Sequence, residues 1–151
     1  MKTELVVGGF LIHNNKILLI HHRKLDKWLP PGGHINENET PDEALEREFA
    51  EELNLKIEIL NKVAVASEGN IKKQLAVPFY VNVHSVGDHD HCCLFYLCRP
   101  INQEQLEVNK SELKDFMWVS SEELDQKHIS TDVKHIAVKA FELFNSGKIK
   151  I

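Results

Sequence analysis

Two apolar runs near the N-terminus predict a β-hairpin. The runs extend from Glu4 to His13 and from Lys16 to His22, and they are separated by the polar pair Asn14-Asn15. Apolar runs joined by two turn-forming residues are typical of antiparallel strands with a tight connection. We therefore expect the chain to begin with two paired strands.

Three later ranges also show the composition of strands. Lys56 to Val65, Ala76 to Val86 and Cys92 to Cys98 are rich in β-branched and alternating apolar residues. Pro78 cannot donate a backbone hydrogen bond, so we expect its strand to begin late or to lie at a sheet edge. The aromatic residues of the last two ranges are expected to pack in the core or on a sheet face, although one of them could face a nucleobase.

Helical periodicity appears twice. Between Thr131 and Ser146 the apolar residues recur on one helical face, and Gly147 lies just beyond the end. Earlier, Thr40, Pro41 and Glu43 form a helix-start signal, because threonine can cap free N–H groups and Glu43 can complete a capping box. The apolar stripe of this earlier helix consists of Leu45, Phe49 and Leu53.

Three carboxylates lie on one side of the earlier helix. At 3.6 residues per turn, Glu48, Glu51 and Glu52 fall within an arc of about 100°, and Glu48 and Glu52 border the apolar stripe. A Glu-rich helix is usually a solvated acidic face. Carboxylates beside the buried stripe instead face a cleft, where a hard divalent cation such as Mg²⁺ can neutralise their repulsion.

Composition limits the class of protein. The chain has 151 residues with 42% hydrophobic content, which fits one α/β layered domain over residues 1–151. A net charge of −5 argues against a nucleic-acid polymer as partner. The sequence has no apolar run of about 18 residues and no signal-peptide pattern at its N-terminus, so we expect no membrane span and a cytoplasmic location.

The cysteines and nearby histidines suggest no disulfide framework. Cys92, Cys93 and Cys98 are odd in number and two are adjacent. The run from Asp88 to Cys93 could suggest zinc, but structural zinc sites usually need two separated pairs of ligands and only one cluster is evident. We interpret the run as a polar loop followed by buried thiols.

Gly33, Glu39 and the range 47–55 carry a family signature. Gly33 is followed by five residues, Glu39, seven residues and then Arg-Glu-Phe-Ala-Glu-Glu-Leu-Asn-Leu. This resembles the Nudix box, Gly-x5-Glu-x7-Arg-Glu-U-x-Glu-Glu-x-Gly-U, where U is aliphatic or aromatic. Every charged position is filled. Asn54 replaces the family's glycine at a position expected to have positive φ, which asparagine tolerates best after glycine.

The resemblance, which extends from about Val6 to Phe144, implies a Nudix α/β/α sandwich with a mixed sheet. It also implies that Mg²⁺ or Mn²⁺ is bound by three ligands, with Arg47 and Glu39 orienting them. Gly32 and Gly33 have two possible roles, turn geometry or close backbone approach to a phosphate. The implied ligands are Glu48, Glu51 and Glu52.

A second family-like pattern lies near Trp118, where a strand ending in Trp-Val is followed by a short helix. In similar proteins an acidic residue at about the position of Glu112 completes the metal site or acts as base. An ordinary exposed loop glutamate is the alternative. The residue that accepts the proton from water could thus be Glu51, Glu52 or Glu112.

The activity implied by the resemblance is hydrolysis of a nucleoside diphosphate linked to another group. Within that class the compact chain favours a MutT-like (deoxy)nucleoside triphosphate pyrophosphohydrolase, which releases nucleoside monophosphate and pyrophosphate. ADP-ribose, nucleotide-sugar and dinucleotide pyrophosphatases are alternatives, and a non-catalytic nucleotide-sensing module is another. The expected partner is a small-molecule nucleotide, and the protein is expected to be a monomer or homodimer.

Overall fold

The chain begins with the expected hairpin. The computed structural model describes residues 2–63 and 65–149. Strand β1 (Thr3–His13) pairs antiparallel with β2 (Lys16–His22), with Ile12 opposite Ile17. Asn14 and Asn15 both have positive φ, 52° and 61°, as a two-residue type I′ turn requires. The predicted hairpin is therefore confirmed.

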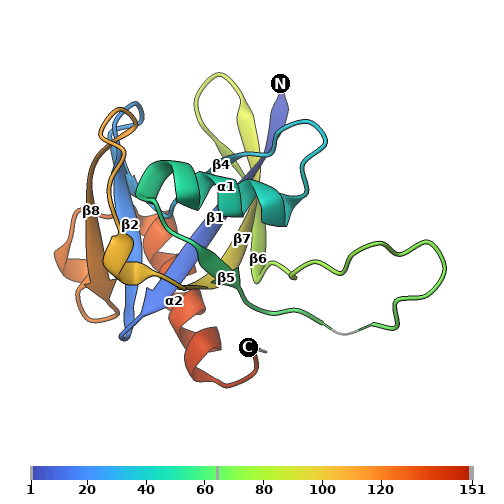
Figure 1. Cartoon of the computed structure of the whole chain (residues 1–151). Helices are drawn as coiled ribbons and strands as arrows, with labels where there is room; N and C mark the ends of the chain where they lie inside the picture. The colour runs from blue at the N-terminus through green and yellow to red at the C-terminus, as the bar shows by residue number, and fades with distance from the viewer. Residues whose placement is uncertain (1, 64, 150–151) are drawn as a thin grey trace.

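Strand β1 is the centre of an eight-stranded sheet. It runs parallel to β7 (Asp90–Pro100) and antiparallel to β2 and β4 (Gly32–His34). The sheet is thus mixed, as the resemblance implied (Figure 1). The remaining strands are β3 (Lys27–Leu29), β5 (Ile57–Ile59), β6 (Tyr80–Ser85) and β8 (Leu113–Ser120), with short 3₁₀ turns at Gln103–Gln105 and Leu124–Gln126.

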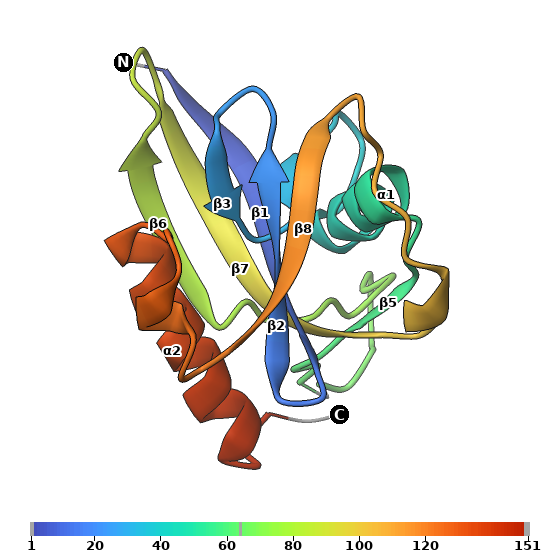
Figure 2. The ribbon, with the colours of Figure 1, turned by 90° about the vertical axis from the view of Figure 1, so that its left-hand side faces the viewer.

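Two helices cover opposite faces of the sheet, α1 (Pro41–Leu53) and α2 (Thr131–Asn145) (Figure 2). Side chains of β1 alternate between them: Val6 and Phe10 join the core cluster of α2, whereas Val7 and Leu11 join that of α1. Burial on both faces explains why β1 is a continuous apolar run rather than an alternating one. The expected α/β/α layering is confirmed.

Helix α1 has the predicted ends. The Thr40 hydroxyl accepts a hydrogen bond from the Glu43 N–H at 3.1 Å, and the Glu43 carboxylate accepts one from the Thr40 N–H at 3.0 Å. At the other end Asn54 adopts a left-handed conformation with φ 55°. Its N–H donates to the carbonyl of Ala50, so the substitution of asparagine for glycine preserves the helix stop.

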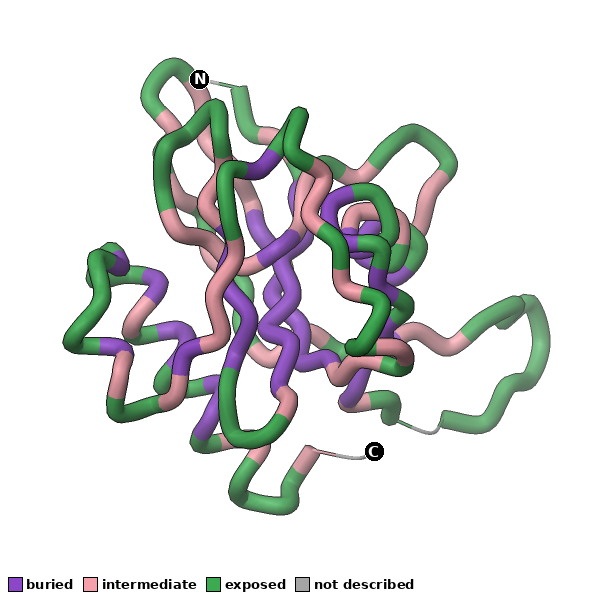
Figure 3. Tube along the Cα trace, turned by 60° about the vertical axis from the view of Figure 1, so that its left-hand side comes forward, coloured by how far each residue is buried: buried purple, intermediate pink, exposed green. Residues whose placement is uncertain are grey.

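The predicted strand over Lys56 to Val65 is too long. Of its described residues only Ile57–Ile59 pair with β7, because Asn61 has a left-handed φ of 71° and turns the chain away from the sheet; Ala64 lies outside the described residues. Beyond it, most of the segment that leads to β6 is exposed, as the green tube in Figure 3 shows. The strand over Ala76 to Val86 begins only at Tyr80, as Pro78 predicted.

None of the helices formed by the described residues is long and apolar enough to cross a membrane.

Candidate active site

Arg47 links α1 to the segment that precedes it. Its guanidinium donates to both oxygens of Glu39, with Nε–Oε2 and Nη2–Oε1 distances of 2.7 and 3.0 Å. The same side chain donates to the carbonyl oxygen of His34 at 3.0 Å and to Glu48 Oε1 at 2.9 Å. A planar guanidinium suits the paired hydrogen bonds to Glu39. Held in this way, Arg47 fixes the position of the Glu48 carboxylate. Arg47 and Glu39 therefore have the geometry expected of residues that orient a ligand.

Gly32 and Gly33 lie in β4, where each makes a close contact that a side chain would block. The Gly32 N–H donates to Glu52 Oε1 at 3.2 Å. A Cβ atom at Gly33 would collide with the Glu48 carboxylate, and one at Gly32 would collide with the carbonyl oxygen of Val7. Neither glycine has a left-handed φ, so turn geometry is the wrong reason for glycine here. Close packing is the reason, because Gly33 lies against the Glu48 side chain of α1 and Gly32 lies against the backbone of β1.

Burial makes the carboxylates of Glu48 and Glu52 costly to ionise. Glu52 is only 2% exposed, and burial raises its pKa to about 8, with the adjacent charge of Glu48 as the next cause. Burial also raises the pKa of Glu48, against the opposing effect of Arg47. A divalent cation would remove this penalty, and carboxylate oxygens are the donors that Mg²⁺ and Mn²⁺ prefer. The donor set therefore fits such an ion.

Glu51 is placed differently from the other two glutamates. Its side chain is 50% exposed, and its Oε2 atom lies 3.3 Å from Arg47 Nη1. The Nη1 atom of Arg47 also donates to Oε1 of Glu48, so Arg47 lies between Glu51 and Glu48. The three carboxylates share one side of α1, as expected, but Glu51 lies at its outer edge.

Glu48 and Glu52 line a cleft that also contains Glu112. The loop of Glu112 is anchored to the end of β2, because the Glu112 carbonyl accepts a hydrogen bond from the Arg23 N–H at 3.0 Å. The charge of Glu112 contributes to the raised pKa values of Glu48 and Glu52. The structure therefore brings Glu112 to the acidic helix, 60 residues after Glu52 in sequence. The rest of the lining comes from His22, Arg23, Lys24, Gly32, Gly33, His34, Asn36 and Ser111.

Arg23 and Lys24 were not predicted as site residues. Both residues line the cleft that also contains the carboxylates, so their positive charges can offset the charge of an anionic ligand. The sequence signal was slight, a basic pair directly after an apolar strand. Such pairs are common on protein surfaces, so only the tertiary arrangement singles them out.

A separate pocket between the sheet and α2 adjoins the cleft. It has a volume of about 170 Å³, somewhat more than the ~150 Å³ cavity that accommodates benzene in an engineered protein. Its walls are mainly apolar, and its polar lining residues include Asn82, His84, His91 and Asp132. His22, Gly32 and Gly33 line both spaces, so a single ligand could occupy them together. Its apolar lining includes Phe10, Ile20, Leu25, Leu29, Phe95 and Ile136, so Phe95 is one aromatic residue that borders a ligand-sized space.

Comparison with known proteins identifies the family. The NUDIX domain matches residues 2–140. A NUDIX-family hydrolase from Clostridium perfringens is 29% identical, with a TM-score of 0.81 over 95% of this chain and 99% of that one. A MutT NUDIX hydrolase from Burkholderia pseudomallei, at 18% identity and a TM-score of 0.67, covers 94% of this chain and 98% of that one and shares the fold.

A curated relative, "8-oxo-dGTP diphosphatase" of Buchnera aphidicola subsp. Schizaphis graminum, is 44% identical over 61 residues. That match covers 38% of this chain and 47% of the relative, so the chain spans about half the length of this protein. The domain match, in contrast, covers nearly the whole chain, including the acidic helix and β4. The chain belongs to the NUDIX family.

Proposed function

We propose that this protein is a divalent-metal-dependent hydrolase of nucleoside diphosphates linked to another group. The observation that carries the proposal is the cleft in which Glu48, Glu52 and Glu112 meet beside Gly33. Glu48, Glu51 and Glu52 would hold Mg²⁺ or Mn²⁺. When bound, the cation would polarise the diphosphate and lower the pKa of a coordinated water.

Residues in and beside the cleft would each have a different role. Arg23 and Lys24 neutralise the phosphate oxygens that lie farther from the carboxylates. Arg47 holds Glu48 in place through its bond of 2.9 Å. The water proton goes to a carboxylate of the cleft, Glu52 or Glu112, or to Glu51 at its edge.

The adjoining pocket favours a nucleotide over an inorganic or small aliphatic diphosphate. Its mainly apolar walls suit a heterocyclic base, while Asn82 and Asp132 offer hydrogen-bonding groups to the edge of that base. Within this class we propose a (deoxy)nucleoside triphosphate pyrophosphohydrolase that releases nucleoside monophosphate and pyrophosphate. The curated relative named 8-oxo-dGTP diphosphatase supports a triphosphate substrate.

The decisive experiment is a product assay over a panel of nucleotides. Canonical and 8-oxo deoxynucleoside triphosphates, ADP-ribose and a dinucleoside polyphosphate would be incubated with Mg²⁺ or Mn²⁺, with and without inorganic pyrophosphatase. We expect triphosphates to yield phosphate only when pyrophosphatase is present, and a chelator to abolish turnover. Preferential cleavage of ADP-ribose would overturn the triphosphate assignment, and metal-independent turnover would overturn the metal site.

A further inference from the structure

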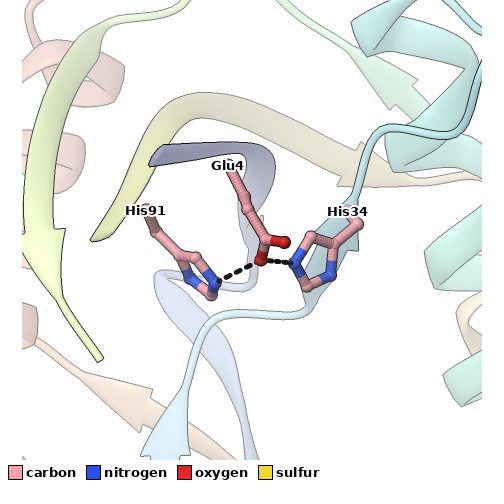
Figure 4. A group of neighbouring side chains, drawn as sticks. All are labelled: Glu4, His34 and His91. Atoms are coloured by element: carbon pink, nitrogen blue, oxygen red, sulfur yellow. Dashed lines mark hydrogen bonds and ion pairs between the residues drawn. The ribbon is translucent and has the colours of Figure 1, made fainter. Parts of the chain in front are cut away.

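A second group of possible metal ligands lies outside the carboxylates of α1. Glu4 of β1, His34 of β4 and His91 of β7 each place a ligand atom within 4.8 Å of the other two (Figure 4). The three residues are separated by 30 and 57 positions in sequence, and the pairing of β1 with both β4 and β7 brings them together. This convergence is a property of the sheet.

One oxygen of the Glu4 carboxylate, Oε1, lies close to the imidazole rings of three histidines. Glu4 Oε1 lies 2.9 Å from His34 Nε2, 3.0 Å from His89 Nε2 and 3.8 Å from His91 Nε2. His89 Nε2 and His91 Nε2 are 3.2 Å apart. Donor atoms of a tetrahedral zinc site, each about 2.0–2.1 Å from the metal, are themselves about 3.4 Å apart. The spacing therefore resembles that of ligands around one ion.

The tautomer of His89 supports this interpretation. Its Nδ1 atom lies 2.7 Å from Asp88 Oδ1, so Nδ1 carries the hydrogen that the carboxylate accepts. In a neutral ring Nε2 then has a lone pair, and that lone pair faces Glu4 Oε1 at 3.0 Å. Two acceptors repel at this distance unless a proton or a metal ion lies between them. A carboxylate on the outer nitrogen of a histidine is also the usual partner of a metal-bound imidazole.

The two oxygens of the Glu4 carboxylate have different partners. Lys2 pairs with the second oxygen of Glu4, Oε2, at 3.0 Å, and leaves Oε1 to the histidines. Imidazole and carboxylate together suit Zn²⁺ and similar transition metals, whereas Mg²⁺ prefers oxygen ligands alone.

We propose that Glu4, His34 and His91, with His89 as a fourth ligand, bind one transition-metal ion of the Zn²⁺ type. This site is distinct from the carboxylate cleft. It would join β1, β4 and β7 at one end of the sheet. His34 also lines the cleft, and His91 lines the adjoining pocket. The ion would therefore tie one wall of the cleft to one wall of the pocket.

Metal titration of the full chain tests the proposal. Chelator-treated protein would be titrated with Co²⁺, and then with Zn²⁺ as competitor, in excess Mg²⁺ so that the carboxylate cleft is saturated. We expect one tightly bound Co²⁺ with visible ligand-field absorption that Zn²⁺ removes. The ring resonances of His34, His89 and His91 should shift in the NMR spectrum, while those of His135, exposed on α2, should not.

Variants assign the binding to these residues. His91→Gln should weaken Co²⁺ binding at least about 100-fold, and Asp88→Asn about 10- to 100-fold, as loss of an outer partner usually does. His135→Gln is the matched control and should bind normally. Because Asp88 is 93% exposed, its variant is expected to fold even if His91→Gln does not.

Two results would overturn the proposal. One is a Co²⁺ spectrum that is unchanged in both variants, which would place the ion elsewhere. The other is an absence of tight Co²⁺ or Zn²⁺ binding in the wild-type chain, which would mean that hydrogen bonds alone hold the cluster together. Retention of the Co²⁺ spectrum in Glu52→Gln would further show that the two sites are separate.

Discussion

The side chain of Glu52 is almost fully buried, yet its only hydrogen bond in the described structure comes from the backbone N–H of Gly32, at 3.2 Å. One neutral donor does little to offset the cost of an ionised carboxylate in this environment. An ionised Glu52 therefore destabilises the fold when no cation accompanies it. Two of the predictions below follow from this relationship.

The first prediction concerns the pH dependence of stability without metal. The pKa of Glu52 is about 8 in the folded protein against an ordinary 4.5, so the folded protein binds this proton more tightly than the unfolded chain does. Its contribution to the free energy of unfolding is complete below about pH 4.5 and is lost as the pH rises toward 8. Relative to wild type, Glu52→Gln should therefore become progressively more stable from pH 5 to pH 8.

Urea denaturation in chelator at several pH values measures this difference. Glu122→Gln is the control, because Glu122 is exposed and its substitution should give a nearly constant difference. If the difference in free energy of unfolding between Glu52→Gln and wild type is equally constant with pH, the pKa of Glu52 is not raised in the folded protein.

The second prediction concerns catalysis. Glu52→Gln and Glu51→Gln should each lower kcat by about 10²-fold or more. Both are proposed ligands of the metal ion, and loss of such a ligand withdraws stabilisation of transition-state charge. Circular dichroism should show intact folds. Near wild-type kcat in both variants would place the catalytic metal site elsewhere.

The third prediction concerns Glu112. If it is the general base, Glu112→Gln should lower kcat about 10²- to 10⁴-fold and remove the acidic limb of the pH–rate profile. Comparison with the profile of Glu51→Gln identifies the base, because the variant that keeps an unchanged acidic limb has not lost it. Unaltered kcat at every pH in Glu112→Gln would leave proton abstraction to the helix carboxylates.

The fourth prediction concerns the end of α1. Asn54 has φ 55°, and its side-chain amide donates to the Gln105 carbonyl at 3.1 Å. Asn54→Ala should lower the free energy of unfolding by about 1–2 kcal/mol, because alanine is strained in this conformation. Asn54→Gly, which restores the family residue, should cost much less. Equal losses in both variants would show that the side-chain bond, rather than the backbone conformation, stabilises this helix end.

The sequence alone was sufficient to predict the elements with local signals. The Asn14-Asn15 turn and the Thr40 capping box lie within a few residues of the structures they specify. The spacing of Glu39, Arg47 and the three glutamates likewise sufficed for the acidic helix, because a helix fixes which side chains share a side. The mixed sheet was predicted from the resemblance to the Nudix family, because the pattern of apolar and polar residues does not specify strand order.

Only the tertiary structure determined which distant residues meet. No local pattern joins His34 to His91 or Glu4, and the run from Asp88 to Cys93 is a single cluster of possible ligands in the sequence. Strand register sets these meetings, and register depends on how β1 pairs with both β4 and β7. In the same way, the reason for glycine at position 33 is the Glu48 carboxylate above it, a contact that depends on how α1 packs on the sheet.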